Sequence, residues 1–139
     1  MNYELVGCLE HVSLPLLNLQ NIKAKMDTGA DTSALHAENI EYTFLDHQKY
    51  VNFTFTHDDG QQSRLQALFL EERTIKSSSG EVTVRPIVKL LISIGAHEFE
   101  TEFSLVNRNK MNYRILIGRN TLGHRFAVVP SQIFLLQEG

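Results

Sequence analysis

An aspartate, a threonine and a glycine stand together at Asp27, Thr28 and Gly29, directly after a stretch in which apolar and polar residues alternate. A carboxylate at the end of a strand is held in few positions, the threonine hydroxyl can brace the loop, and the glycine allows a tight turn and a close approach. Two such loops facing each other would bring together two carboxylates that share one proton. One could then take a proton from water while the other donates one to a carbonyl oxygen. The tripeptide also occurs in ordinary turns, so a purely structural interpretation is open as well.

A second feature lies much later in the chain, where the apolar run Ile115-Leu116-Ile117 ends in Gly118, Arg119 and Asn120. Together with Asp27-Thr28-Gly29-Ala30-Asp31, this run resembles the signature of the retropepsins, the protease family of retroviruses. The resemblance implies that Asp31 pairs with Arg119, and a bidentate contact would lock the catalytic loop onto the late motif. The alternative is two unrelated surface charges.

The chain resembles still more closely a bacterial branch of this family, the one associated with the glutamate ligase RimK. The similarity covers nearly the whole chain, in the stretches 22–30, 32–37, 76–80, 85–88 and 107–119. It implies a single retropepsin-like domain over residues 1–139 and an aspartic peptidase or amide hydrolase, in some members linked to trimming glutamate-rich tails. Two positions depart from the branch. Asp31 stands where a basic residue is usual, and Val129 stands before Pro130 where an acid is usual.

Members of this branch are often labelled ATP-dependent zinc proteases, and the sequence does not support that label. It contains neither a His-Glu-x-x-His pair for zinc nor a Gly-x-x-x-x-Gly-Lys-Ser/Thr loop for ATP. We therefore expect no metal and no cofactor.

The pattern along the chain is mostly of period two, which is typical of half-exposed strands. We expect an all-β, closed or nearly closed barrel with little helix. Strands are predicted at 22–26, 51–56, 65–70, 82–94 (with a possible break at Pro86), 97–106, 114–117, 126–129 and 133–136. Helical turns are predicted at 33–36, capped by Asp31 or Thr32, and at 120–123, ending at a glycine.

The predicted hairpin 73–84 has a small polar tip at Ser77, Ser78, Ser79 and Gly80. Such a tip suits a mobile cover over a substrate cleft, and an ordinary exposed hairpin is the equal alternative. Arg85, Arg108 and Arg114 are candidates for binding an acidic peptide by forked hydrogen bonds. Solvated surface arginines are the alternative for each of them.

A second copy of the chain is the partner that the dyad requires. Asp27-Thr28-Gly29 occurs once, and the other aspartates, Asp31, Asp46, Asp58 and Asp59, lie in no second copy of the loop. A pair built from equivalent loops must then span two chains about a two-fold axis. Terminal strands help to build that interface in retropepsins, and residues 133–136 could serve there or in the core. The first hypothesis is thus a homodimeric aspartic hydrolase, and the second is a non-catalytic peptide-binding module on the same fold.

Composition adds limits on partners and compartment. The 139 residues carry a formal net charge of −3, so we expect no grip on nucleic acid or on an anionic membrane. No apolar run approaches the roughly 20 residues of a spanning helix. The start of the chain has no signal-peptide pattern, and Cys8 is the single cysteine. Both features favour a reducing cytoplasm.

Overall fold

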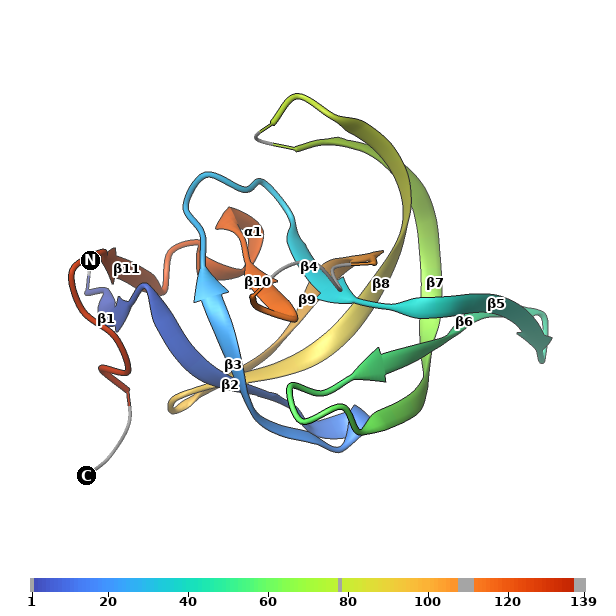
Figure 1. Ribbon diagram of the computed structural model, residues 1–139, viewed down its shortest axis with the longest axis horizontal. Helices are drawn as coiled ribbons and strands as arrows, with labels where there is room; N and C mark the ends of the chain where they lie inside the picture. The colour runs from blue at the N-terminus through green and yellow to red at the C-terminus, as the bar shows by residue number, and fades with distance from the viewer. Residues whose placement is uncertain (1, 78, 108–111, 137–139) are drawn as a thin grey trace.

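The computed structural model describes residues 2–77, 79–107 and 112–136 (Figure 1). Within these ranges it contains eleven strands, one short α-helix and one 3-10 turn. In chain order they are β1 (Glu4–Gly7), β2 (Leu9–Leu14), η1 (Pro15–Leu17), β3 (Leu19–Met26), β4 (Ser33–His36), β5 (Glu38–Leu45), β6 (Gln48–Thr56), β7 (Gln62–Lys76), β8 (Val82–Ile94), β9 (His97–Val106), β10 (Ile115–Ile117), α1 (Arg119–Leu122) and β11 (Phe126–Val129).

The larger sheet closes into a barrel. Its strands follow the order β2-β3-β10-β4-β9-β8-β7-β6-β5, and β2 also pairs with β8 through Ser13 and Ser93. That pairing joins the six strands from β2 to β8 into a ring, while β7, β6 and β5 continue away from it. The predicted all-β closed barrel with one short helix is therefore confirmed. Closing the ring leaves β5 as an open edge of this sheet (Figure 1).

The inward side of the barrel holds a continuous apolar core. Leu35, Phe103, Ile115 and Ile117 are among its fully buried members. Each side chain of this size stabilises the fold by about 1.5–3 kcal/mol through burial. The core therefore fixes β4, β9 and β10, the strands on which the predicted site is built.

Strand β10 lies between β3 and β4, parallel to the first and antiparallel to the second. Residues 33–36 were predicted as a helical turn, and this was wrong because they form β4. Strand β4 pairs with β10 on one side and in parallel with β9 on the other. Two ladders with distant partners outweigh the weak local preference for a turn.

Strands β7 and β8 form a long hairpin that arches over the end of the barrel where the β3–β4 loop lies (Figure 1). The possible break at Pro86 is absent, and β8 runs through the proline, which pairs with Glu72 on β7. The ladder from β8 to β9 ends at Ile87, so Pro86 lies just outside it. At the tip, Gly80 has a φ of +87°, a left-handed conformation that favours glycine.

Strands β1 and β11 form a small parallel sheet beside the barrel, and the C-terminal segment crosses it. Residues 133–136 were predicted as a strand, and this was wrong. The buried carboxylate of Glu10, 1% exposed, accepts hydrogen bonds from the N–H groups of Leu135 at 2.8 Å and Leu136 at 3.3 Å, and also from Gly7 at 2.7 Å. The amides that a strand would place in a ladder are thus bound by one side chain. A Cβ on Gly7 would lie 2.5 Å from the Gln132 carbonyl oxygen, so the crossing requires glycine.

Candidate active site

Asp27 continues the barrel ladder by one residue beyond β3. Its N–H donates to the carbonyl oxygen of Ile117 at 2.8 Å. Its carboxylate Oδ1 accepts the N–H of Gly29 at 2.9 Å, and its carbonyl oxygen accepts the N–H of Ala30 at 3.3 Å. These three bonds fix both the backbone and the side chain of a half-buried aspartate, while Thr28 and Gly29 are exposed beside it.

Two glycines allow this loop to pack so tightly. A Cβ on Gly29 would lie 3.2 Å from Asp27 Oδ1. A Cβ on Gly118 would lie 2.9 Å from the carbonyl oxygen of Ala30, a backbone atom that cannot yield easily. The two motifs that the sequence analysis joined are therefore in direct contact.

Arg119 and Asp31 meet, as the resemblance implied, but their contact is not bidentate. One terminal nitrogen of Arg119, Nη2, contacts Asp31 Oδ1, and the other, Nη1, donates to the carbonyl oxygen of Thr28 at 2.7 Å. The guanidinium is thus divided between a carboxylate and the backbone of the Asp27 loop. Both side chains are well exposed, at 52% and 83%, so the ion pair contributes little stability of its own. Backbone bonds from Arg119 N–H to the Ala30 carbonyl at 2.7 Å and from Asn120 N–H to the Asp31 carbonyl at 3.2 Å complete the attachment.

A buried group of hydroxyls lies behind the loop, and the sequence analysis missed it. Ser33 Oγ accepts the N–H of Gly118 at 2.9 Å and lies 3.0 Å from Asn120 Oδ1 and 2.6 Å from Thr121 Oγ1. Thr121 Oγ1 in turn lies 2.7 Å from Thr101 Oγ1. One consistent set of donors runs from Thr101 to Thr121, from Thr121 to Ser33, and from Ser33 to Asn120. The relay ties β9 and α1 to β4 directly behind the Asp27 loop.

The tip of the hairpin lies apart from these contacts. Ser77 N–H donates to the Glu81 carbonyl at 2.8 Å, Gly80 N–H donates to the Ser77 carbonyl at 2.9 Å, and the hydroxyls of Ser77 and Ser79 are 2.8 Å apart. These bonds close a turn, and the action of this hairpin as a cover stays a prediction. Ser78 and Arg108 lie outside the described residues.

Arg85 lies on β8, whereas Arg114 lies just before β10, at the end of that strand away from the Asp27 loop. The Nε of Arg85 donates to the Thr83 hydroxyl at 2.8 Å, and its Nη1 is 3.5 Å from Ser104 Oγ. The Nε of Arg114 lies 3.7 Å from Asp58 Oδ1. Of these two arginines, Arg114 thus forms a long ion pair with a carboxylate, whereas the described contacts of Arg85 are with hydroxyls.

His36 is a buried histidine beside a carboxylate. Its ring is fully buried and its Nε2 lies 2.7 Å from Glu38 Oε1, which also accepts the Thr56 hydroxyl at 2.8 Å. The hydrogen bond from Thr56, followed by that from His36, lowers the pKa of Glu38 below its ordinary value of 4.5. The pair packs at the far end of β4 from the Asp27 loop.

The chemistry that this arrangement offers is that of a single, half-buried carboxylate held in a fixed position. Across residues 2–77, 79–107 and 112–136, no group of three histidine, cysteine, aspartate or glutamate side chains is placed to hold a metal ion. Helices of the described chain are also too short to cross a membrane.

Comparison with known proteins places nearly the whole chain in one group. Residues 5–138 match the model of the RimB-like family, described as retropepsin-like aspartic endopeptidase RimB. A relative from Shewanella halifaxensis, named "Probable alpha-L-glutamate ligase", is 34% identical over 97% of this chain, and one of the same name from Parasynechococcus marenigrum is 35% identical over 91%. The matched region makes up 30% and 28% of these relatives, so the chain spans less than a third of their length.

A solved structure has the same fold. The crystal structure of Lpg0085, a protein of unknown function from Legionella pneumophila, superposes with a TM-score of 0.85 and 28% sequence identity. The match covers 99% of this chain and 100% of the Legionella chain. The same fold is therefore found in a crystallised chain of matching extent. A similar sequence also makes up part of the longer relatives that are named as ligases.

Proposed function

Because the chain belongs to the RimB-like family of retropepsin-like aspartic endopeptidases, we propose that it is an aspartic peptidase or amide hydrolase that works as a homodimer. The observation that carries the proposal is the fixed position of Asp27. Its N–H and its carboxylate are both held by the backbone, at Ile117 and Gly29, and among the described residues only one of its two carboxylate oxygens is hydrogen-bonded. The sequence supplies one such loop per chain, so a catalytic pair requires a second copy.

In the proposed reaction the two Asp27 carboxylates share one proton. The ionised carboxylate takes a proton from a water molecule as its oxygen attacks the amide carbon. The protonated one gives its proton to the carbonyl oxygen. Collapse of the tetrahedral species then breaks the C–N bond: the amine leaves with the proton of the pair, and one hydroxyl of the tetrahedral species returns its proton to the pair as the carboxylic acid forms. Thr28, Gly29, Ala30, Asp31 and Arg119 hold the loop in place and do not themselves react.

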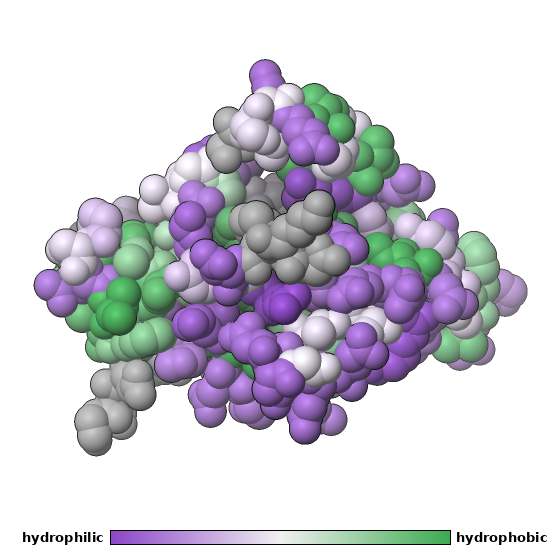
Figure 2. All heavy atoms as spheres, in the orientation of Figure 1, coloured by the Kyte–Doolittle hydropathy of each residue, from purple (hydrophilic) through white to green (hydrophobic). Residues whose placement is uncertain are grey.

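The terminal segments bear on how two copies would meet. In this chain residues 132–136 are bound to their own protomer through the Glu10 carboxylate and the backbone of Cys8 and Leu9. Apolar side chains nonetheless stay exposed on β1 and on this segment, at Tyr3, Leu5, Ile133 and Leu135. Figure 2 shows apolar residues gathered on that side of the molecule. This supports contact between folded protomers without exchange of terminal strands.

We extend the proposal to glutamate-rich peptide tails as substrates. The support is the name of the relatives, since a glutamate ligase forms amide bonds to glutamate and a hydrolase of this kind would break them. We also place the chain in the cytoplasm, which the single cysteine supports.

The test compares the wild-type chain with Asp27→Asn on peptides that include glutamate-extended ones. The matched control is Asp46→Asn, because Asp46 lies in the exposed β5–β6 turn with a φ of +51°, which asparagine also adopts. Loss of the catalytic carboxylate should lower kcat at least about 100-fold, whereas the control keeps its rate. Equal activity in wild type and Asp27→Asn would remove Asp27 from the mechanism and leave the peptide-binding module as the function.

Subunit mixing tests the dimer directly. Equal amounts of wild-type and Asp27→Asn chains, after exchange, should retain about one quarter of the activity of the same total amount of wild type, since only one dimer in four is intact. About one half would show that each chain acts alone.

A further inference from the structure

Asp27 and Arg85 lie on the same face of the sheet. Five residues pair side by side across β3, β10, β4, β9 and β8, namely Lys25, Leu116, Ala34, Ser104 and Ile87. Side chains two apart on a strand share a face. Asp27 is two residues beyond Lys25, and Arg85 is two residues before Ile87. Leu35, Ile115 and Ile117 point the other way, into the core. Asp27 and Arg85 therefore share the outer face of the barrel sheet, on opposite sides of this row.

The Arg85 guanidinium is half-buried, and among the described residues it has no ion pair. Its described contacts are two hydroxyls, Thr83 and the more distant Ser104, and no carboxylate of the described chain forms an ion pair with it. Burial lowers the pKa of Arg85, with the Glu81 carboxylate acting weakly in the opposite direction. Burying a cation without an ion-pair partner costs free energy, and part of that cost is recovered when an anion binds to it.

The neighbouring strand provides a direct contrast. Arg73 is the cross-strand partner of Arg85, so the two guanidinium groups share a face. Arg73 contacts the Glu71 carboxylate at 2.6 Å and the Glu102 carboxylate at 3.1 Å, and the Glu71 bond raises its pKa. The fold thus neutralises one of two adjacent arginines with two carboxylates and leaves the other with none. A purely structural role would not require that difference.

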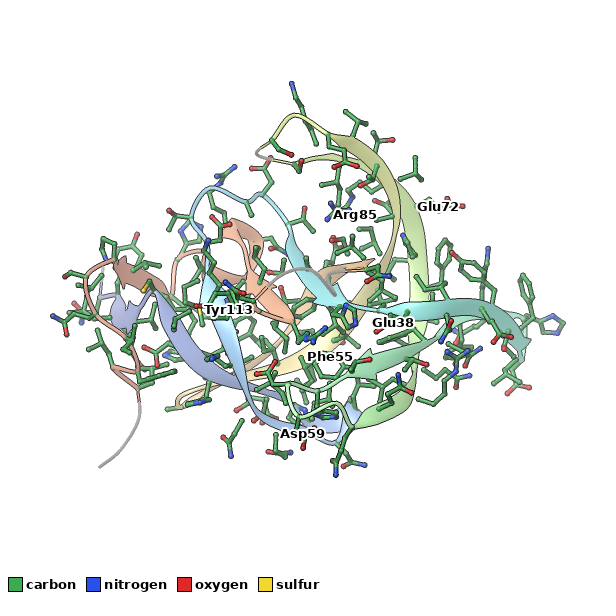
Figure 3. All side chains as sticks on the ribbon, viewed as in Figure 1. Glu38, Phe55, Asp59, Glu72, Arg85 and Tyr113 are labelled. Carbon is green, nitrogen blue, oxygen red and sulfur yellow. The ribbon has the colours of Figure 1, made fainter. Side chains whose placement is uncertain are left out.

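The position of Arg85 also suits a ligand. In Figure 3 its side chain points from β8 into the opening between the hairpin and β4, while Glu72 on β7 points away. Ser104 Oγ, its neighbour, donates to the Ser33 carbonyl at 3.3 Å, which links Arg85 to the strand that follows the Asp27 loop. An extended peptide lying across Asp27 and under the hairpin would pass this guanidinium.

We propose that Arg85 is a carboxylate-binding subsite of the cleft, which takes an acidic side chain or the C-terminal carboxylate of a substrate peptide through the forked donors of its guanidinium. This rests on the proposed function for the identity of the cleft, and it assigns specificity and not catalysis to Arg85. A guanidinium binds a carboxylate with two parallel hydrogen bonds, which a lysine cannot reproduce. Glutamine side chains carry no charge, so the guanidinium adds little to the affinity for them.

The experiment measures binding, so that it does not depend on turnover. Fluorescein-labelled glutamate and glutamine peptides of equal length are titrated by anisotropy into Asp27→Asn protein that carries Arg85, Arg85→Gln or Arg85→Lys. Arg85→Gln should weaken binding of the glutamate peptide about 10- to 100-fold. The glutamine peptide is unchanged if Arg85 binds an acidic side chain, and it is weakened equally if Arg85 binds the terminal carboxylate. The affinity of Arg85→Lys for the glutamate peptide should lie between those of the other two proteins, because lysine keeps the charge and lacks the two parallel donors. C-terminal amidation separates the two sources, since the effect of Arg85 disappears on amidation only if the terminal carboxylate is the one bound.

Arg73→Gln is the matched control, and it should change either affinity by less than about twofold because its carboxylate partners are largely exposed. The proposal is wrong if Arg85→Gln weakens the two amidated peptides equally, if it changes the affinity of no peptide, or if Arg73→Gln has the same effect as Arg85→Gln. Thermal midpoints of all variants show whether they are folded. If Arg85→Gln does not fold, the binding data for Arg85→Lys test the proposal in its place. Selective binding without hydrolysis by the wild-type chain would support the subsite and refute only the peptidase.

Discussion

Replacing Ser33 by alanine removes the hydroxyl at the centre of the relay behind the Asp27 loop. Ser33 Oγ accepts the Gly118 N–H and contacts Asn120 Oδ1 and Thr121 Oγ1, all within 3.0 Å. In Ser33→Ala, Asn120 still accepts the Ser33 backbone N–H and Thr121 still has Thr101, so those groups keep a partner. The buried N–H of Gly118 loses its partner. An unsatisfied buried donor costs about 1–3 kcal/mol, and the lost hydroxyl bonds raise the total to about 2–4 kcal/mol.

Thermal unfolding measures this cost. For a chain of this length, each kcal/mol of lost stability lowers the midpoint by about 3–4 °C, so the midpoint of Ser33→Ala should fall by about 6–16 °C. Ser13→Ala is the matched control, since Ser13 Oγ accepts the Asn21 N–H at 3.0 Å in an exposed position where water can replace it. The control should lose less than about 1 kcal/mol.

A double-mutant cycle tests the relay itself. Ser33→Ala and Thr121→Val each remove one side of a 2.6 Å contact, so their effects on the free energy of unfolding should be non-additive by at least about 0.5 kcal/mol. Additive effects, or a Ser33→Ala protein as stable as Ser13→Ala, would refute the reasoning that this hydroxyl anchors the loop.

Two further predictions concern buried or shared carboxylates. Glu10→Gln weakens hydrogen bonds to a charged acceptor, so the free energy of unfolding should fall by about 1.5–3 kcal/mol and the C-terminal amides that Glu10 binds should exchange hydrogen faster. The exposed Glu41→Gln is its control, and equal exchange in the two variants would contradict the role of Glu10. Glu38 has a lowered pKa, chiefly through the Thr56 hydrogen bond, so its contribution to stability is present above pH 4.5 and is lost as the pH falls below it. Glu38→Gln should therefore flatten the pH dependence of the free energy of unfolding below about pH 4.5, and an unchanged slope would count against this.

The features that the sequence predicted are those encoded over a few adjacent residues. Asp27-Thr28-Gly29 followed a period-two stretch, and the short helix was predicted at 120–123 from its terminal Gly123. Both the barrel and α1 followed from such local signals. The predictions for residues 33–36 and 133–136 were wrong because the conformation of both segments depends on partners elsewhere in the chain. These partners are two ladders in the first case and the Glu10 carboxylate in the second.

One of the missed residues left a signal. In β2, Glu10 has the same phase as the buried Val12 and Leu14, so a carboxylate stood on the apolar side of an alternating strand. A charge in that phase indicates bound donors. Ser33 and Thr121 left no comparable signal, because serine and threonine are common in loops and short helices. Their association is visible only once β4 and α1 lie side by side.

The loop and the hairpin are held in very different ways, and this difference favours a rigid catalytic group beneath a movable cover. The Asp27 loop is bound through backbone contacts to Ile117, Arg119 and Asn120, and the hydroxyl relay lies behind it. The backbone of the outer hairpin pairs only with itself, since the ladder from β8 to β9 ends at Ile87, and side chains such as Arg73 and Arg85 make its contacts to β9. Opening is least costly where fewest contacts must break. Arg85 lies two residues outward from that boundary, so a substrate carboxylate bound there would add a contact between the hairpin and the peptide that it covers.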